Sequence, residues 1–259
     1  MKTNELRHIA RLSWQIFCRD LVSRYRGSKL GYIWLLLSPL AMAGAWIYIR
    51  RLGNLGTADG PASYVAYVTT GMFLWQGFTR QVQSSMNQLS ASRHLLSKYV
   101  FPWEALVLAA WAETIIEFAV SMVVLVVILV ITGSVSGWGL VISLPWIASL
   151  LLLASGLGLV LTPFGLLYED VGRALALSLQ IMFFMIPIVY ALPPSGMTRA
   201  IVEWNPVAVL LVGARDELLL GETTFLFQGV IATVLGFVVV VLGFAVLRVA
   251  RPHLAVTAN

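Results

Sequence analysis

The sequence predicts an all-α integral membrane protein with six membrane-spanning helices. Hydrophobic residues make up 59% of its 259 residues and charged residues only 11%, whereas an ordinary soluble domain is about 25% charged. Long apolar runs recur along the chain, and Lys and Arg gather at their ends. We therefore expect residues 1–259 to form one transmembrane domain that contacts membrane lipids. No nucleic acid is expected as a partner, because the basic residues are not gathered on a soluble domain.

Residues 3–23 have the pattern of a cationic amphipathic helix. Apolar residues recur at helical spacing, and three arginines mark another side: Arg7, Arg11 and Arg19. Such a helix before a span lies in the plane of the membrane surface. Spacing alone leaves open whether it is only an anchor or also contacts another protein.

A basic turn containing glycines joins this helix to the first span, expected at about residues 32–49. Its cations, aromatics and small residues follow in the order Arg24, Tyr25, Arg26, Gly27, Ser28, Gly31, Trp34 and Pro39. Lys and Arg stay at anionic headgroups, and the uncharged run begins a few residues later. Pro39 inside the span requires a bend or a partner helix. A cleaved signal peptide is disfavoured, because the basic region is about 30 residues long and further spans follow.

Five further spans are expected, at about residues 64–80, 105–131, 144–166, 174–190 and 225–247. The 64–80 run is short and polar, and without it five spans remain and all later segments change sides. With six spans, 13 of the 17 Lys and Arg residues lie on the side of the termini. The positive-inside rule then places both termini in the cytoplasm.

Two segments between spans carry many of the polar residues. Residues 81–102 are polar and then basic, which predicts either a short helix or an ordinary cytoplasmic loop. Residues 191–224 contain Asn205-Pro206 and a stretch, 207–220, that we interpret as amphipathic. Its charges at Arg215 and Asp216 make it unsuited to span a bilayer.

Two carboxylates lie inside the third span. Glu113 and Glu117 are four residues apart and so share one helix face. Ionisable groups at membrane depth suggest function by default. The pair could form a cation or proton site, or it could pair with a basic side chain or bond across a dimer or to the second span.

The chain is not expected to be an enzyme or to bind a metal or cofactor itself. Cys18 is its only cysteine, and its three histidines lack metal-ligand spacing. No Gly-x-x-x-x-Gly-Lys-Ser/Thr loop occurs, so energy for uphill transport would come from another protein. A membrane glycosyl- or acyltransferase remains an alternative, although Glu169, Asp170 and the two span carboxylates have no His or metal partner.

Three stretches resemble the permease subunits of type-2 ABC exporters of the O-antigen, capsule and teichoic-acid family. They are residues 24–39, Lys98-Tyr-Val-Phe-Pro102, and residues 187–216 with Asn-Pro followed by Arg-Asp. The resemblance covers nearly the whole chain. One departure is Glu169, which stands where the family commonly has a basic residue, and this leaves open the contact that such a side chain would make.

The resemblance implies an ATP-driven exporter in the bacterial inner membrane, moving an undecaprenyl-diphosphate-linked polysaccharide of O-antigen type. Two copies of the chain would enclose the channel, and ATP and Mg would bind to two copies of a separate nucleotide-binding subunit. That subunit would contact helix 3–23 and a coupling helix before the third span. The implied contact residues are Arg7, Arg11, Arg19, Asn87, Arg93, His94 and Lys98. A permease for a drug or a small lipid is the alternative.

The family also supplies expectations for the channel. Residues 191–224 would form short re-entrant helices that close its outer mouth, with Asn205, Pro206, Arg215 and Asp216 as the outer gate. A Glu-Thr pair recurs in the family where Glu113 lies, which favours a structural role for that residue. Aromatic faces pack on sugar rings, and the candidate channel-lining aromatics are Trp34, Trp46, Phe73, Trp75, Phe183, Phe184 and Tyr190.

Overall fold

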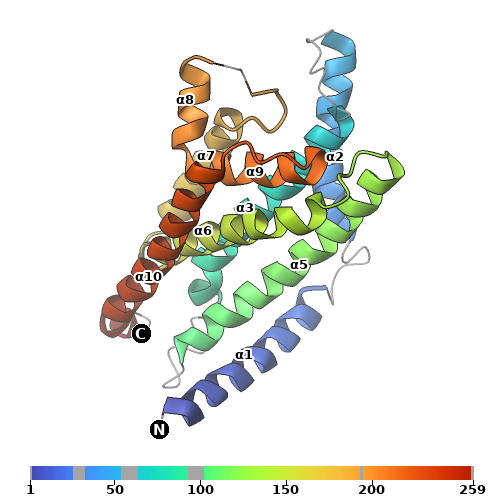
Figure 1. The fold of residues 1–259 in the computed structure, drawn as a ribbon. Coiled ribbons are helices and arrows are strands. Elements are labelled where there is room, and N and C mark those ends of the chain that lie inside the picture. The colour runs from blue at the N-terminus through green and yellow to red at the C-terminus, as the bar shows by residue number, and fades with distance from the viewer. Residues whose placement is uncertain (1, 26–32, 54–63, 93–101, 193–194, 258–259) are drawn as a thin grey trace.

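The computed structural model describes residues 2–25, 33–53, 64–92, 102–192 and 195–257. All regular structure within these ranges is helical, which confirms the all-α prediction (Figure 1). Three helices are long and apolar enough to cross a membrane: α5 (Trp103–Ile131), α6 (Gly139–Leu167) and α10 (Leu226–Thr257) as far as Ala250. A shorter apolar helix covers Leu36–Ile49. The chain is therefore a multi-pass membrane protein. That it has six spans stays a prediction.

Helix α1 (Lys2–Tyr25) matches the helix expected over 3–23 and lies along α5 (Figure 1). Ile16 and Phe17 are buried in one cluster with Trp103 and Leu106 of α5. Burial of this apolar stripe fixes α1 to the bundle. The opposite side keeps Arg7 and Arg11 exposed, as the amphipathic pattern predicts.

Helices α2 (Ile33–Gly53) and α3 (Tyr64–Ala91) form the next pair. Pro39 lies inside α2 and is buried in a cleft lined also by Phe73 of α3 and Phe118 of α5. Partner helices therefore cover the position at which proline removes a backbone hydrogen bond.

Helix α3 begins at the predicted residue but does not end near residue 80. It continues to Ala91, so the prediction of a separate helix beginning at Gln81 is wrong. The polar composition suggested an exit from the membrane, but no Gly or Pro between 81 and 91 breaks the helix. The rest of the predicted coupling segment, residues 93–101, lies outside the described part of the chain.

Helix α6 is central to the bundle and packs against α3, α9 and α10. Small residues on α6 allow its neighbours to approach closely. A Cβ atom on Gly156 would lie 2.7 Å from the backbone nitrogen of Val240 in α10. One on Gly158 would lie 2.5 Å from the carbonyl oxygen of Val82 in α3.

Helix α7 covers Glu169–Met185, so the predicted bounds of 174–190 are wrong at both ends. Its start is earlier because Glu169 and Asp170 suit the positive end of the helix dipole. Its end is earlier because Pro187 disfavours helical geometry at the preceding residue. Ile186 is accordingly extended, with φ −95° and ψ 136°.

Two short helices, α8 (Met197–Trp204) and α9 (Pro206–Leu220), follow α7 before α10 begins. The amphipathic interpretation of 207–220 is wrong. Every residue from Val207 to Arg215 is buried, because α9 packs among α3, α6, α8 and α10. The placement of α8 and α9 as re-entrant helices in a bilayer stays a prediction.

Helix α10 continues ten residues past the expected end at 247. The beginning of α1 and the end of α10 lie on the same, lower side of the view (Figure 1).

Candidate functional site

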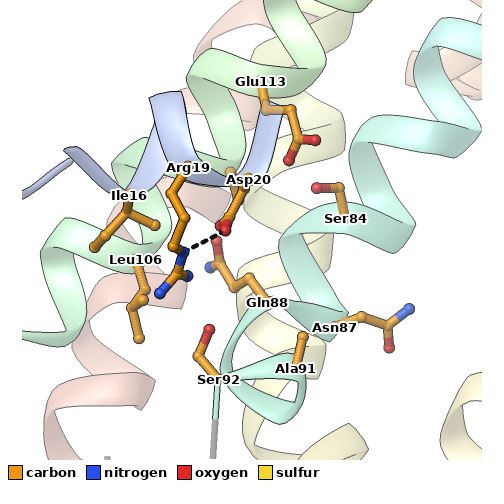
Figure 2. Close-up of a pocket in the computed structure, with 11 residues that line it drawn as sticks. Ile16, Arg19, Asp20, Ser84, Asn87, Gln88, Ala91, Ser92, Leu106 and Glu113 are labelled. Atoms are coloured by element: carbon orange, nitrogen blue, oxygen red, sulfur yellow. Dashed lines mark hydrogen bonds and ion pairs between the residues drawn. The ribbon is translucent and has the colours of Figure 1, made fainter. Parts of the chain in front are cut away.

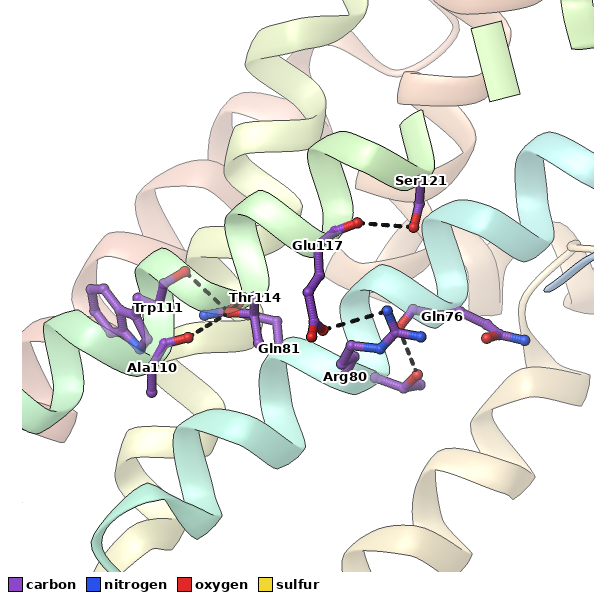
Figure 3. Close-up of polar contacts among 9 residues, drawn as sticks. Gln76, Arg80, Gln81, Ala110, Trp111, Thr114, Glu117 and Ser121 are labelled. Carbon is purple, nitrogen blue, oxygen red and sulfur yellow. Dashed lines mark hydrogen bonds and ion pairs between the residues drawn. The ribbon is translucent and has the colours of Figure 1, made fainter. Parts of the chain in front are cut away.

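A buried polar junction joins α3, α5 and α6. The Gln81 side chain, 1% exposed, lies at its centre and donates to Ser155 Oγ at 2.7 Å. Its carbonyl oxygen accepts a hydrogen bond from Thr114 of α5 (Figure 3). Trp111 Nε1 donates to Ser85 Oγ at 3.0 Å. Such interhelical hydrogen bonds satisfy polar groups inside a membrane bundle and fix the register of its helices.

An ion pair lies beside this junction. Arg80 Nη1 of α3 is 3.7 Å from Glu117 Oε2 of α5 (Figure 3). The Glu117 side chain is 2% exposed and that of Arg80 30%. The structure thus favours the alternative in which Glu117 pairs with a basic side chain, here Arg80 of α3. Glu113 is separate, because it points toward another cavity.

That cavity has a volume of about 360 Å³ and lies among α1, α3 and α5 (Figure 2). Two residues predicted to contact an ATPase partner, Arg19 and Asn87, line it together with Gln88 and Glu113. Arg19 is held by Asp20 at 2.8 Å. Both polar atoms of the buried Gln88 amide lack a hydrogen-bond partner among the described residues.

The other predicted ATPase contacts divide into two groups. Arg7 and Arg11 are exposed nearer the beginning of α1. Arg93, His94 and Lys98 lie outside the described residues, as do Arg26, Gly27, Ser28 and Gly31 of the basic turn. Arg24 and Tyr25 end α1, and Trp34 is exposed on α2.

The predicted outer-gate residues lie on or beside α9. Asn205 and Pro206 are at its start, and Arg215 and Asp216 are in its second half. Asn205 caps this helix, since its side-chain oxygen accepts from the backbone nitrogens of Val207 at 3.0 Å and Ala208 at 3.3 Å. Pro206 occupies the first helical position, where its missing N–H costs nothing. Gly221, with φ 70°, ends the helix in the left-handed conformation.

Arg215 connects α9 to the segment that follows α7. Its side chain is 1% exposed, and Nη1 donates to the Pro187 carbonyl oxygen at 2.6 Å. The guanidinium lies 3.7 Å from the ring centroid of Tyr67, whose hydroxyl donates to the Tyr190 carbonyl oxygen at 2.9 Å. Asp216 accepts from Thr224 at 2.8 Å. Arg215 and Tyr67 therefore hold residues 187–190, where the backbone is not helical.

Replacing Asn205 with alanine is expected to destabilise α9. The cap satisfies two backbone donors that have no partner within the helix, and its loss costs about 1 kcal/mol. The measurement is the thermal denaturation midpoint of the detergent-solubilised protein. Asn205→Asp keeps an acceptor oxygen and is expected to retain most of the stability, whereas an equal loss in both variants would contradict the capping role.

The candidate channel aromatics do not share one environment. Phe73 is 1% exposed, Trp75 7% and Phe183 9%, so these three side chains are buried within the bundle. Trp75 and Phe183 belong to one cluster, against which Trp46 packs. Trp34 and Phe184 are exposed, and Tyr190 is half-buried. The role of all seven in lining a channel stays a prediction.

The sequence matches the ABC-2 type transporter family over residues 11–219. The chain belongs to this family. It is 28% identical to an O-antigen export system permease protein, RfbA, of Klebsiella pneumoniae, over 84% of this chain and 86% of the relative. It is 25% identical to another RfbA of that organism, over 88% and 87%. The polysialic acid transport protein KpsM of Escherichia coli is 24% identical over 80% of both chains.

As an ABC-2 family member, the chain is a transport subunit.

The sequence alone does not point to several residues of the sites described above. Arg80 was counted only among cytoplasmic cations, and Gln81, Gln88 and Tyr67 were not singled out. Helical spacing offered a signal for Arg80, because a polar side chain recurs every three or four residues from Gln76 to Asn87. No sequence signal pairs Arg80 with Glu117 or Tyr67 with Arg215.

Proposed function

We propose that this protein is the permease subunit of an ATP-driven exporter that moves a lipid-linked polysaccharide outward across the bacterial cytoplasmic membrane. The substrate is an undecaprenyl-diphosphate-linked chain of O-antigen type. Both termini lie in the cytoplasm, and two copies of the chain enclose the channel. A separate nucleotide-binding subunit, also in two copies, binds ATP and Mg²⁺.

The observation that carries this proposal is the match to polysaccharide permeases along most of the chain. The three relatives cover 80–88% of this chain. The match to the ABC-2 type transporter family begins in α1 and ends in α9, at residue 219. The hydrogen bonds that join α3, α5 and α6 inside the bundle also suit a transport subunit, because they fix how these helices pack. Within the described residues, no cluster of His, Cys, Asp and Glu could hold a metal ion.

The ATPase subunit is proposed to bind at the end of the bundle where α1, α3 and α5 meet. The cavity there is lined by Arg19, Asn87 and the Gln88 amide, which has no hydrogen-bond partner in the described part of the chain. A buried amide without a partner costs free energy, and a polar side chain of the ATPase would satisfy it. Residues 93–101, which carry three of the predicted contacts, follow α3 directly.

Replacing Ala91 with tryptophan is expected to abolish co-purification of the ATPase subunit. Ala91 is exposed at the end of α3 and lines the cavity, so the indole would occupy the proposed docking space. The measurement is the amount of ATPase retained on the tagged permease after detergent extraction. Val249→Trp on the exposed side of α10 is the control and is expected to retain the ATPase. Full retention with Ala91→Trp would contradict the proposed contact.

The transport activity itself is tested with the purified permease–ATPase complex in lipid nanodiscs. Lipid-linked glycan extracted from cells that lack the permease is expected to stimulate ATP hydrolysis, because substrate binding is coupled to the catalytic cycle. Stimulation by small apolar drugs but not by glycan would reject the polysaccharide in favour of the small-substrate permease.

A further inference from the structure

One side of α3 carries an arc of polar side chains that the buried junction does not use. Its members recur at helical spacing on one side of the helix and are half-buried or exposed: Gln76, Thr79, Arg80, Gln83, Asn87 and Ser90. The opposite side, with Gln81 and Ser85, packs against α5 and α6. At 100° per residue the arc covers about a quarter of the helix circumference. Arg80 pairs with Glu117 of α5, whereas the side chains of Gln76, Gln83, Asn87 and Ser90 form no hydrogen bond with another helix in the described part of the chain.

The upper part of this arc lies at membrane depth if α3 spans. Arg80 is 16 residues from the start of α3 at Tyr64, which is about 24 Å along a helix. Glu117 is 14 residues from the end of α5 at Ile131, or about 21 Å. Against a hydrocarbon layer of about 30 Å, both values place the ion pair inside the layer near its inner edge. Gln76 lies one turn deeper.

Polar side chains at that depth do not face lipid tails. An amide without a hydrogen-bond partner in hydrocarbon costs several kcal/mol, roughly 2–7 depending on the reference, and a guanidinium costs more. Polar residues inside a membrane face the bundle interior or a water-filled path. The arc also explains why α3, with 28 residues, is not among the helices apolar enough to qualify as spans.

The ion pair determines what the arc can bind. Glu117 is buried and its carboxylate lies 3.7 Å from the Arg80 guanidinium, so it neutralises this cation, while the Arg80 side chain stays 30% exposed (Figure 3). The arc is thus polar and nearly uncharged overall, with a planar fork of N–H donors between two amides, Gln76 and Gln83. A strongly anionic ligand has no uncompensated cation here, whereas hydroxyl groups can both donate to and accept from these side chains.

We propose that this arc faces the path of the exported chain and exchanges hydrogen bonds with its sugar hydroxyls. Arg80, oriented by Glu117, is the central contact. The inference rests on the proposed function and names the surface that the polysaccharide touches on the cytoplasmic half of the path. Many weak, neutral contacts let a chain slide, because each hydroxyl exchanges one partner for the next at little cost.

The test is the reaction of single cysteines with a membrane-impermeant charged maleimide in inside-out membranes. Gln76→Cys and Gln83→Cys are made in a Cys18→Ser background. The matched control is Ile116→Cys, because Ile116 adjoins Glu117 at the same depth but is 40% exposed on an apolar side of α5. We expect Gln76→Cys and Gln83→Cys to react and Ile116→Cys not to react, and we expect added undecaprenyl-diphosphate-linked glycan to protect both reactive cysteines.

Three results would contradict the inference. Reaction of Gln76→Cys as slow as that of Ile116→Cys would show that the arc does not face water. Reaction without protection, in a complex whose ATPase the same glycan stimulates, would show that the chain passes elsewhere. A complex that glycan does not stimulate would instead reject the proposed function, so the two failures are distinguishable. The Arg80→Gln permease is expected to bind the ATPase subunit but not to export glycan. Unchanged export by this variant would also contradict the role of Arg80.

Discussion

Replacing Arg215 with leucine is expected to remove most of the folded protein from the membrane. Arg215 is 1% exposed and donates to the Pro187 carbonyl oxygen at 2.6 Å. Its loss removes this charged donor and the 3.4 Å ion pair with Asp216, so the carbonyl keeps only the longer 3.3 Å bond from the Tyr67 hydroxyl. Removing one member of a buried charged network costs about 3–5 kcal/mol. The measurement is membrane abundance together with the thermal denaturation midpoint.

Arg199→Leu provides the control for this prediction. Arg199 also forms an ion pair, 2.7 Å from Glu203, but both side chains are one third exposed. Such pairs contribute about 0–1 kcal/mol, so near-normal abundance is expected. If both variants lost the same stability, the buried contact between α9 and residues 187–190 would not be what stabilises this end of the bundle.

Replacing Gly158 with alanine is expected to separate α6 from α3. The new Cβ would lie 2.4 Å from Ser85 Cβ and 2.5 Å from the Val82 carbonyl oxygen, and backbone atoms cannot move aside as a flexible side chain can. Thr162, one turn along α6, would also lose its 3.0 Å bond to the Ser85 carbonyl oxygen. Overpacking of this kind costs about 1–3 kcal/mol, measured as a lower denaturation midpoint.

Gly165→Ala is the matched substitution on the same helix. Its Cβ would meet only the side chain of Met86, at 3.2 Å, and methionine adjusts readily. A small or absent shift is expected. Equal shifts in the two alanine variants would mean that helix propensity, and not the close approach of α6 to α3, determines the effect.

Local signals in the sequence predicted most helix positions, and long-range contacts account for what they missed. Asn205-Pro206 marks the start of α9 because both residues act within one helical turn. Pro187 could likewise have predicted the end of α7. The polarity of residues 81–91 predicts an exit from the membrane, whereas α3 continues through them to Ala91.

Partners across the bundle were not predictable from one sequence. Glu117 was recognised as a costly charge in a span, but its pairing with Arg80 depends on how α3 and α5 are oriented about their axes. The same holds for Arg215, whose charge makes its segment unsuited to span a bilayer but whose side chain is buried. Burial of Phe73 and Trp75 follows from packing and not from their aromatic character.

The most direct test of the proposed function compares two glycan pools in cells that lack this protein and any redundant exporter. The account predicts that polysaccharide disappears from the cell surface while its lipid-linked precursor accumulates inside, and that the wild-type gene restores both pools. Unchanged surface and intracellular pools would contradict polysaccharide export by this permease.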